Sequence, residues 1–315
     1  MTETKELRVE AMRREAEGVL SVELRDPLGA ELQPFSAGSH IDLILPNGMT
    51  RSYSLLNDPA ERHRYVVAVG LDANSQGGSR FVHDRLRVGA AVKVAGPRNN
   101  FPLNENAQSH VLIAGGIGIT PMLAMMRRLA AADQSFHLYY GVREAARAAF
   151  VEDIVALRGG FTQHIDAERG CPMDLGEIIA SHPDSDFYCC GPGPMLAAFE
   201  EATEALPEDR VHLEYFAPKA QDDSASNNAF DVECRTSGIE VHVTEDRTIA
   251  EALAEAGVAV ELSCQEGICG TCETPVLGGE PDHRDSVLSK AERAANKTMM
   301  VCVSRCRGDR LVLDL

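Results

Sequence analysis

The first hundred residues alternate between apolar and polar positions in short runs that turn residues separate. These runs occupy residues 18–25, 39–45, 50–56, 64–71 and 90–96, with Asp26-Pro27 and Pro46-Asn47-Gly48 among the turns. A period of two buries one face of a strand and leaves the other face polar. Several short strands bounded by such turns predict a small antiparallel β-barrel over residues 1–104.

From residue 105 to residue 217 the pattern changes to apolar runs that alternate with amphipathic stretches. Residues 110–116 and 135–142 indicate buried strands, and residues 120–131 and 149–159 have helical spacing. Residues 186–206 indicate a strand, a turn and a helix. Strands that alternate with helices predict a parallel, doubly wound α/β domain over residues 105–217.

A third pattern follows a polar stretch. Residues 218–229 are rich in Ser, Asn and Asp and lack apolar periodicity, which is typical of an interdomain linker. Beyond it, residues 230–243 alternate around a Ser-Gly turn like a hairpin, and residues 248–257 indicate a helix that ends at Gly257. We therefore expect a multidomain chain that ends in a compact α+β, ferredoxin-like unit over residues 230–315.

Four cysteines of this last unit have the spacing of iron ligands. Cys264, Cys269 and Cys272 follow a C-x4-C-x2-C pattern, and 29 residues separate the third from Cys302. Plant-type [2Fe–2S] clusters take three thiolates from one loop and a fourth from a distant strand. A structural zinc site, the main alternative, usually pairs two C-x2-C units or adds histidines at short spacing. A Rieske cluster needs two histidine ligands, which this loop lacks; Cys306 is interpreted as a bystander.

Two motifs in the first segment suit a flavin. The run RSYS (51–54) can offer a phenol to an isoalloxazine ring, a guanidinium to a phosphate and a hydroxyl to the ring edge. The run QGGSRF (76–81) has glycines that allow close backbone approach and N–H groups that can hold a phosphate. Each motif alone is commonly a plain strand or loop, and their order along one barrel makes them informative. The candidate flavin-binding residues are Arg51, Tyr53, Ser54, Gly77, Gly78 and Ser79.

Two motifs of the α/β segment suit a dinucleotide. The glycine-rich turn AGGIGITP (114–121) joins a buried strand to a helix, whose N-terminus attracts a pyrophosphate. Thr120 is expected to cap that helix. A second turn, YCCGPGP (188–194), ends another parallel strand, where ligands of such sheets bind. The candidate residues are Gly115, Gly116, Gly118, Thr120, Gly191 and Pro192.

The preference between the two nicotinamide dinucleotides depends on a single residue. Asp166 is the candidate partner of the adenosine ribose hydroxyls, which would favour NADH over NADPH. The same aspartate could equally be a loop residue. Arg143 could hold a 2′-phosphate, so the residues alone leave the dinucleotide open.

Composition narrows the class of partner. With 48 acidic and 30 basic residues the net charge is −18, which argues against nucleic acid and anionic membranes as partners. Electrostatic steering to a protein partner and plain solubility both fit that charge. Nine cysteines without a disulfide framework fit a reducing cytoplasm. The first residues have no apolar signal-peptide core, and no run of 18 apolar residues occurs, so no membrane span is expected.

Taken in order, these motifs resemble the phthalate dioxygenase reductase family over essentially the whole chain. The likeness includes RxYS, GGS, PRNNFPL (97–103), AGGIGITPM (114–122), CGPGP (190–194) and the cysteine pattern. QEGICGTC, GEPDHRD and the terminal RLVLDL are most similar to the branch of reductases that serve vanillate O-demethylases. One departure is Gln76, where members usually carry Arg, which leaves one fewer positive charge near the flavin phosphate.

The resemblance implies FMN as the flavin, and FAD is the alternative from the wider superfamily. It also implies NADH as the electron donor and a [2Fe–2S] cluster as the group that passes electrons to the acceptor. It places Cys190 beside the nicotinamide and Phe216 against the flavin ring; a core aromatic at a domain edge is the other interpretation of Phe216. The implied activity is that of an NADH-dependent flavin iron–sulfur oxidoreductase, the reductase component of a two-component Rieske aromatic oxygenase or O-demethylase. Two alternatives are a stand-alone reductase of a small molecule such as a quinone, and a ferredoxin fused to an inactive flavin-like barrel.

Overall fold

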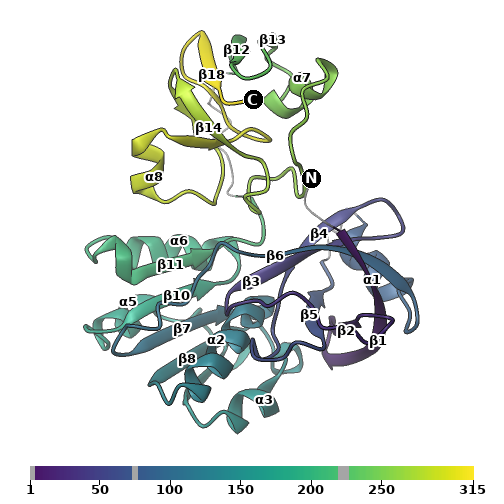
Figure 1. Ribbon diagram of the computed structural model, residues 1–315. Helices are drawn as coiled ribbons and strands as arrows, with labels where there is room; N and C mark the ends of the chain where they lie inside the picture. Colours follow the sequence, from purple (N-terminus) through teal and green to yellow (C-terminus); the bar gives the residue numbers. More distant parts are fainter. Residues whose placement is uncertain (1–3, 73–76, 219–226) are drawn as a thin grey trace. The chain divides into compact units, whose positions relative to one another are not determined.

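The computed structural model describes residues 4–72, 77–218 and 227–315 (Figure 1). The chain divides into two compact units, Thr2–Phe216 and Ala217–Leu315. The first unit contains a curled antiparallel sheet followed by a parallel sheet, and the second contains a smaller mixed sheet. The multidomain class expected from the sequence is confirmed. Gln76 and residues 219–226 of the expected linker lie outside the described residues.

Six antiparallel strands form the curled sheet in the order β4-β3-β6-β1-β2-β5. Its edge strands β4 and β5 meet through the bridge between Leu55 and Val67, so the sheet is a partly closed barrel. Residues 4–16 form a first strand that the sequence analysis did not identify. The elements are β1 (Thr4–Ala16), β2 (Val19–Arg25), β3 (Ser39–Ile44), β4 (Thr50–Ser54), β5 (Tyr65–Gly70), α1 (Gly78–Asp84) and β6 (Ala91–Asn99).

Helix α1 is a second difference from the sequence analysis, which treated the Gly-Gly-Ser run as a loop. Gly77 precedes the helix with φ 116°, a left-handed conformation that glycine adopts without strain. Val82 is the buried side chain on the inner face of α1, where it joins the core of the curled sheet. One buried contact in a seven-residue helix gives too little periodicity for recognition from sequence.

The parallel sheet has the strand order β11-β10-β7-β8-β9. The chain begins at the centre with β7, adds β8 and β9 on one side, and then returns to place β10 beside β7 (Figure 1). The carboxyl ends of β7 and β10 therefore form the topological switch point, where open α/β sheets bind ligands. The strands are β7 (His110–Gly115), β8 (Phe136–Val142), β9 (Gly160–Ile165), β10 (Asp186–Cys190) and β11 (Val211–Glu214). The helices are α2 (Ile119–Ala131), α3 (Val151–Ala156), α4 (Asp166–Arg169), α5 (Leu175–Ala180) and α6 (Gly193–Ala202), with 3-10 turns at Gly116–Gly118, Ala145–Arg147 and Glu208–Arg210.

One apolar cluster joins the two sheets of the first unit. Leu56 and Phe101 from the curled half pack in the same buried cluster as Met122 and Met126 of α2. Burial of this shared surface removes apolar area from water, which favours association of the two halves. This contribution is non-directional, so it does not by itself set the orientation of one half relative to the other. The shared core explains why Thr2–Phe216 behaves as one compact unit.

The second unit contains a five-stranded sheet in the order β13-β12-β18-β14-β16. Helix α7 begins with a capping box between Thr248 and Glu251, and Gly257, with φ 77°, follows its end as expected. The elements are β12 (Phe230–Cys234), β13 (Ile239–Val243), α7 (Ile249–Glu255), β14 (Glu273–Gly278), β15 (Pro281–Asp282), α8 (Lys290–Ala295), β16 (Thr298–Met300), β17 (Arg305–Cys306) and β18 (Arg310–Leu313). Across the ranges that the structure describes, none of the helices has the length and apolar character needed to cross a bilayer.

Candidate functional site

The two flavin motifs of the sequence lie against each other in the curled half. A Cβ atom at Gly78 would lie 2.9 Å from Arg51 Cγ and 3.1 Å from Arg51 Nε, so the arginine in this position packs directly against the glycine. The arginine also donates to the carbonyl of Thr50 at 2.9 Å, and Ser79 Oγ accepts from the Asp72 N–H at 3.3 Å. The guanidinium and the glycine turn therefore converge, as an anion site needs.

Tyr53 and Ser54 end β4 next to this convergence. Tyr53 is half-buried against the core of the curled sheet, and burial raises the pKa of its phenol to about 12, so the ring stays neutral. Ser54 is 4% exposed, and its hydroxyl donates to Glu214 Oε2 at 3.3 Å. This bond crosses from the curled half to the last strand of the parallel sheet.

Glu214 is a residue of this site that the sequence analysis missed. It ends β11, beside Cys190 at the end of β10. Burial raises the pKa of the Glu214 carboxyl to about 8, and the Ser54 bond opposes that shift. A carboxyl whose pKa burial moves toward neutral pH is a frequent feature of functional sites. The signal available in the sequence was an acidic residue two positions before Phe216, at the end of β11.

The two dinucleotide motifs meet at the switch point. A Cβ atom at Gly118 would lie 2.1 Å from the carbonyl oxygen of Cys190, and one at Gly115 would lie 2.6 Å from Pro192 Cδ. A Cβ atom at Gly191 would approach Gly115 Cα to 3.2 Å. These glycines permit close approach of the two strand ends. Gly116 differs, because its φ of 54° favours glycine while the space around it is open.

Thr120 does not cap helix α2, which corrects the expectation from the sequence. The helix begins at Ile119 after Gly118, which provides no side-chain cap. Thr120 lies inside the first turn, 2% exposed, and its hydroxyl donates to the Ile117 carbonyl at 3.1 Å. Helix α2 thus begins at Ile119 instead of after Thr120, and its first turn directly follows Gly118, so the positive end of the helix dipole lies at the glycine turn.

The paired cysteines of β10 face different clusters, as strand alternation requires. Cys189 packs with the apolar residues under α5 and α6, whereas Cys190 joins the cluster that contains Leu56. Both side chains are fully buried. Burial raises the pKa of the Cys190 thiol, and the nearby Glu214 charge adds to the effect, so the thiol is neutral and unreactive.

Asp166 and Phe216 lie at the rim of this arrangement. Asp166 begins α4 at the carboxyl end of the edge strand β9, two strands from the glycine turn, and its Oδ1 lies 3.5 Å from His164 Nε2. Its side chain is 41% exposed. Phe216, two residues after β11, is 37% exposed. Both residues follow the carboxyl ends of strands, but at opposite edges of the sheet, because β9 and β11 are its two outer strands.

The four cysteines of the second unit form two pairs. Cys264 hydrogen-bonds Cys269, and Cys272 hydrogen-bonds Cys302. Within each pair the contact lowers the pKa of one thiol, Cys269 or Cys272, and raises the pKa of its partner, Cys264 or Cys302, because the two sulfurs share one proton. Iron binds the thiolate form. Two pairs suit two irons with two thiolates each. In the described residues, no group of three or more Cys, His, Asp or Glu is arranged for a single metal ion.

The backbone of the cysteine loop turns its N–H groups toward the sulfurs. The Glu266 N–H donates to Cys264 Sγ at 3.3 Å, and the Ile268 N–H reaches the same sulfur. The Gly267 N–H approaches Cys302, which joins the loop to the distant ligand. Gly267 has φ 69°, and a Cβ atom there would lie 2.6 Å from Val303 Cγ2. N–H donors around four thiolates are what a [2Fe–2S] cluster needs, so the residues fit that group.

Family models match two parts of the chain. Residues 232–307 match the 2Fe-2S iron-sulfur cluster binding domain, and residues 112–201 match the oxidoreductase NAD-binding domain. The first match contains all four paired cysteines. The second contains both glycine turns.

Curated relatives align over nearly the whole chain. Phenoxybenzoate dioxygenase subunit beta of Ectopseudomonas oleovorans is 49% identical over 98% of this chain and 97% of the relative. Tetrachlorobenzoquinone reductase of Sphingobium chlorophenolicum is 44% identical, with 99% and 98% covered. Vanillate O-demethylase oxidoreductase of a Pseudomonas strain is 40% identical, with 98% and 99% covered.

Solved structures agree with this class of protein, which is a modular reductase that combines nicotinamide and iron–sulfur domains. Phthalate dioxygenase reductase matches with TM-score 0.72 and 40% identity over 99% of this chain and 98% of that chain. An intact type IV self-sufficient cytochrome P450 monooxygenase matches with TM-score 0.91 and 42% identity; the chain spans 41% of its length. The chain belongs to the phthalate dioxygenase reductase family. It is an NADH-dependent flavin iron–sulfur oxidoreductase, with an NAD-binding domain and a 2Fe-2S iron-sulfur cluster binding domain.

Proposed function

We propose that this protein is the reductase component of a two-component system whose partner is a Rieske-type aromatic oxygenase, with an O-demethylase as the first candidate. Electrons pass from NADH to FMN, from FMN to the [2Fe–2S] cluster, and from the cluster to the oxygenase. NADH gives up two electrons as a hydride, whereas the cluster accepts one electron. A flavin supplies the chemistry that converts one mode of transfer into the other.

In this proposal the first unit holds and orients the reactants. Arg51 and the turn Gly77–Ser79 bind the FMN phosphate, Tyr53 lies along the flavin, and Ser54 faces the reacting edge. The glycine turn at 115–118 and the first turn of α2 hold the pyrophosphate of NADH, and the turn 190–192 borders the nicotinamide. Asp166 binds the adenosine ribose, and Phe216 covers the flavin until nicotinamide replaces it.

The second unit provides the outlet, with Cys264, Cys269, Cys272 and Cys302 as the iron ligands. The domain limits that accompany this assignment are 1–104 for FMN, 105–217 for NADH, 218–229 for the linker and 230–315 for the cluster. With nine free cysteines in the chain, we also place the protein in the reducing cytoplasm.

The observation that carries the proposal is the meeting of both motif pairs in one compact unit. Ser54 bonds Glu214, and Glu214 lies beside Cys190, whose carbonyl lies against Gly118. Strand β4, which carries the proposed flavin residues (the flavin strand), and the glycine turn 115–118 therefore both lie next to the carboxyl ends of β10 and β11. Hydride transfer needs this proximity, because reacting atoms must approach to about 3–3.5 Å.

The first experiment is an anaerobic titration of the purified protein with NADH, followed by visible absorbance and low-temperature EPR. Loss of flavin absorbance together with a rhombic [2Fe–2S] signal supports the electron order. Flavin reduction without that signal would refute the role of the four cysteines. If NADH changed neither the flavin absorbance nor the EPR signal, the dinucleotide site would be refuted. The alternative of a ferredoxin fused to an inactive flavin-like barrel would then be favoured.

The partner is tested by mixing this protein with the oxygenase component of a Rieske O-demethylase that has been purified without its own reductase. NADH consumption coupled to formaldehyde release from an aromatic methyl ether supports the proposal. A small-molecule reductase is the second candidate, because a relative 44% identical is a tetrachlorobenzoquinone reductase. Rapid quinone turnover together with no transfer to the Rieske protein would favour that alternative.

A further inference from the structure

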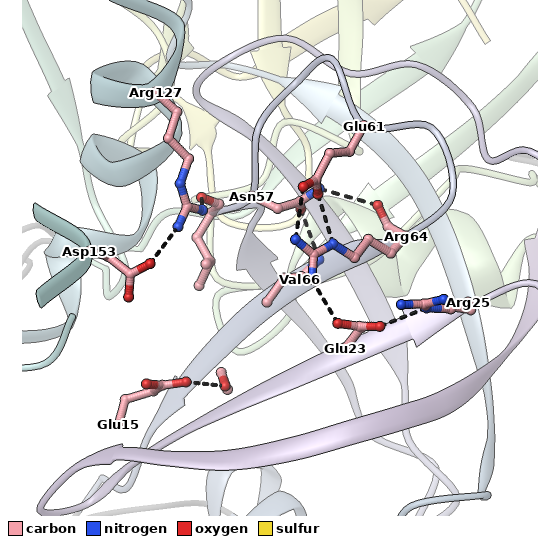
Figure 2. Close-up of polar contacts among 11 residues, drawn as sticks. Glu15, Glu23, Arg25, Asn57, Glu61, Arg64, Val66, Arg127 and Asp153 are labelled. Carbon is pink, nitrogen blue, oxygen red and sulfur yellow. Dashed lines mark hydrogen bonds and ion pairs between the residues drawn. The ribbon is translucent and has the colours of Figure 1, made fainter. Parts of the chain in front are cut away.

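Arg127 links the nucleotide half of the first unit to the segment that follows the flavin strand. It lies on α2, and its guanidinium donates through Nη1 to the Leu56 carbonyl and through Nη2 to Asp153 Oδ1 at 3.1 Å (Figure 2). The arginine side chain is 21% exposed. A guanidinium is a planar fork of fixed geometry, so two bonds to two different elements fix its orientation.

The accepting carbonyl is two residues beyond Ser54. The intervening Leu55 forms the bridge that closes the curled sheet, and the Leu56 N–H donates to the Val66 carbonyl at 2.9 Å. Leu56 thus has its N–H bonded to the flavin half and its C=O bonded to α2. Movement of α2 relative to this carbonyl is resisted by a directional bond, whereas the apolar packing around Leu56 is non-directional.

A network on the flavin side keeps the accepting segment rigid. Asn57 is 1% exposed; its side-chain oxygen accepts from the Val66 N–H at 2.9 Å, and its amide donates to Glu61 at 2.9 Å. Arg64 binds both oxygens of Glu61 at 2.8 Å and reaches Glu23 of β2 at 2.9 Å (Figure 2). Burial would raise the pKa of the Glu61 and Glu23 carboxyls, but the bonds from Arg64 lower it, so both stay charged at neutral pH.

The other end of the connection is the dinucleotide turn. Helix α2 begins at Ile119, directly after Gly118, and Arg127 comes eight residues later, about 12 Å along the axis. The helix is therefore a short rigid rod between the pyrophosphate turn and the flavin strand. Hydride transfer is sensitive to such placement, since a misplacement of about 1 Å can lower the rate about 100-fold.

We propose that Arg127 is a positioning residue for hydride transfer: it fixes the flavin strand β4 relative to helix α2, and so the flavin relative to the nicotinamide. This inference rests on the proposed electron order. The bonds of Arg127 go to the Leu56 carbonyl and to Asp153, which belong to neither proposed binding site, so its loss should change the geometry of the reacting pair while both binding sites remain.

The test compares three variants of the full holoprotein. Arg127→Met removes both bonds and retains much of the side-chain bulk. Arg128→Met is the matched control, because Arg128 is the next residue on the same helix but pairs with Glu105 at 2.5 Å. Arg127→Lys retains one donor that can reach the Leu56 carbonyl. Anaerobic stopped-flow reduction by NADH gives the limiting rate and the dissociation constant, and long-wavelength charge-transfer absorbance reports the stacking of nicotinamide on flavin.

For R127M we expect a limiting rate lower by about 10- to 100-fold, a weaker charge-transfer band, and a dissociation constant and flavin content close to those of the wild type. R128M should match the wild type, and R127K should recover part of the rate and of the band. A wild-type rate and band in R127M would overturn the proposal, as would loss of flavin from R127M without recovery in R127K. If NADH failed to reduce the flavin of the wild-type protein, the proposed function itself would fail, so the two failures are distinguishable.

Discussion

Replacement of Gly118 by alanine tests whether contact between the two glycine turns produces the nicotinamide site. Gly118 has φ −62° and ψ −3°, which alanine adopts without strain, so any loss must come from the added methyl group. That Cβ atom would lie 2.1 Å from the Cys190 carbonyl oxygen, whereas ordinary contact begins at 3.4 Å. One turn must therefore move by more than about 1 Å, since both contacting groups are backbone.

Such a shift separates the turn proposed to hold the pyrophosphate from the turn proposed to border the nicotinamide. We expect G118A to lower the limiting rate of flavin reduction by NADH at least about 100-fold. The free energy of unfolding should fall by about 1–3 kcal/mol, as for other overpacked sites. Dithionite should still reduce flavin and cluster, because the flavin strand and the cysteine loop are unchanged. Stopped-flow absorbance with each reductant, and thermal unfolding, measure these effects.

Gly116→Ala is the matched control. Gly116 has φ 54° with no atom within 4 Å of the added Cβ, so this variant has conformational strain of about 1–2 kcal/mol without a clash. We expect a modest loss of stability and a rate within about tenfold of the wild type. Equal rates of NADH oxidation in G118A and wild type, or equal losses in both glycine variants, would refute the steric argument.

Three further changes test other parts of the structure. Cys302→Ser should abolish the EPR signal and cytochrome c reduction while NADH still bleaches the flavin, because one iron loses a thiolate; normal cytochrome c reduction would contradict the assigned outlet. Glu214→Gln should remove a pH dependence: the folded-state pKa of Glu214 is raised to about 8, so its protonated form contributes stability that is complete below the unfolded value near 4.5 and is lost as the pH rises through 8. The variant lacks this loss, so its stability relative to the wild type should rise by about 3–5 kcal/mol as the pH rises from 4.5 to 8, measured by urea unfolding, and a pH-independent difference would contradict the raised pKa. Thr248→Ala should lower the stability of the second unit by about 1 kcal/mol in thermal unfolding, because α7 loses its capping box with Glu251, and an unchanged midpoint would count against that role.

The sequence by itself determined the elements and motifs whose signals are local. The spacing of four cysteines, the glycine turn after a buried strand and the alternation along the strands each depend on a few neighbouring residues. These signals were sufficient for the multidomain class, the parallel sheet, and the cluster-binding and dinucleotide-binding domains, whereas the choice of FMN and NADH came from the family resemblance. They failed where the local signal was weak, as for strand β1, helix α1 and the start of α2 at Ile119 rather than after a Thr120 cap.

The tertiary structure decided the features that depend on residues far apart in the chain. The raised pKa of Glu214 comes from burial and from Ser54, which lies 160 positions earlier. The requirement for glycine at position 118 comes from the Cys190 carbonyl, and the role of Arg127 comes from a carbonyl at position 56. No local pattern encodes such contacts, because burial, close approach and hydrogen-bond partners are set only when the two sheets pack together.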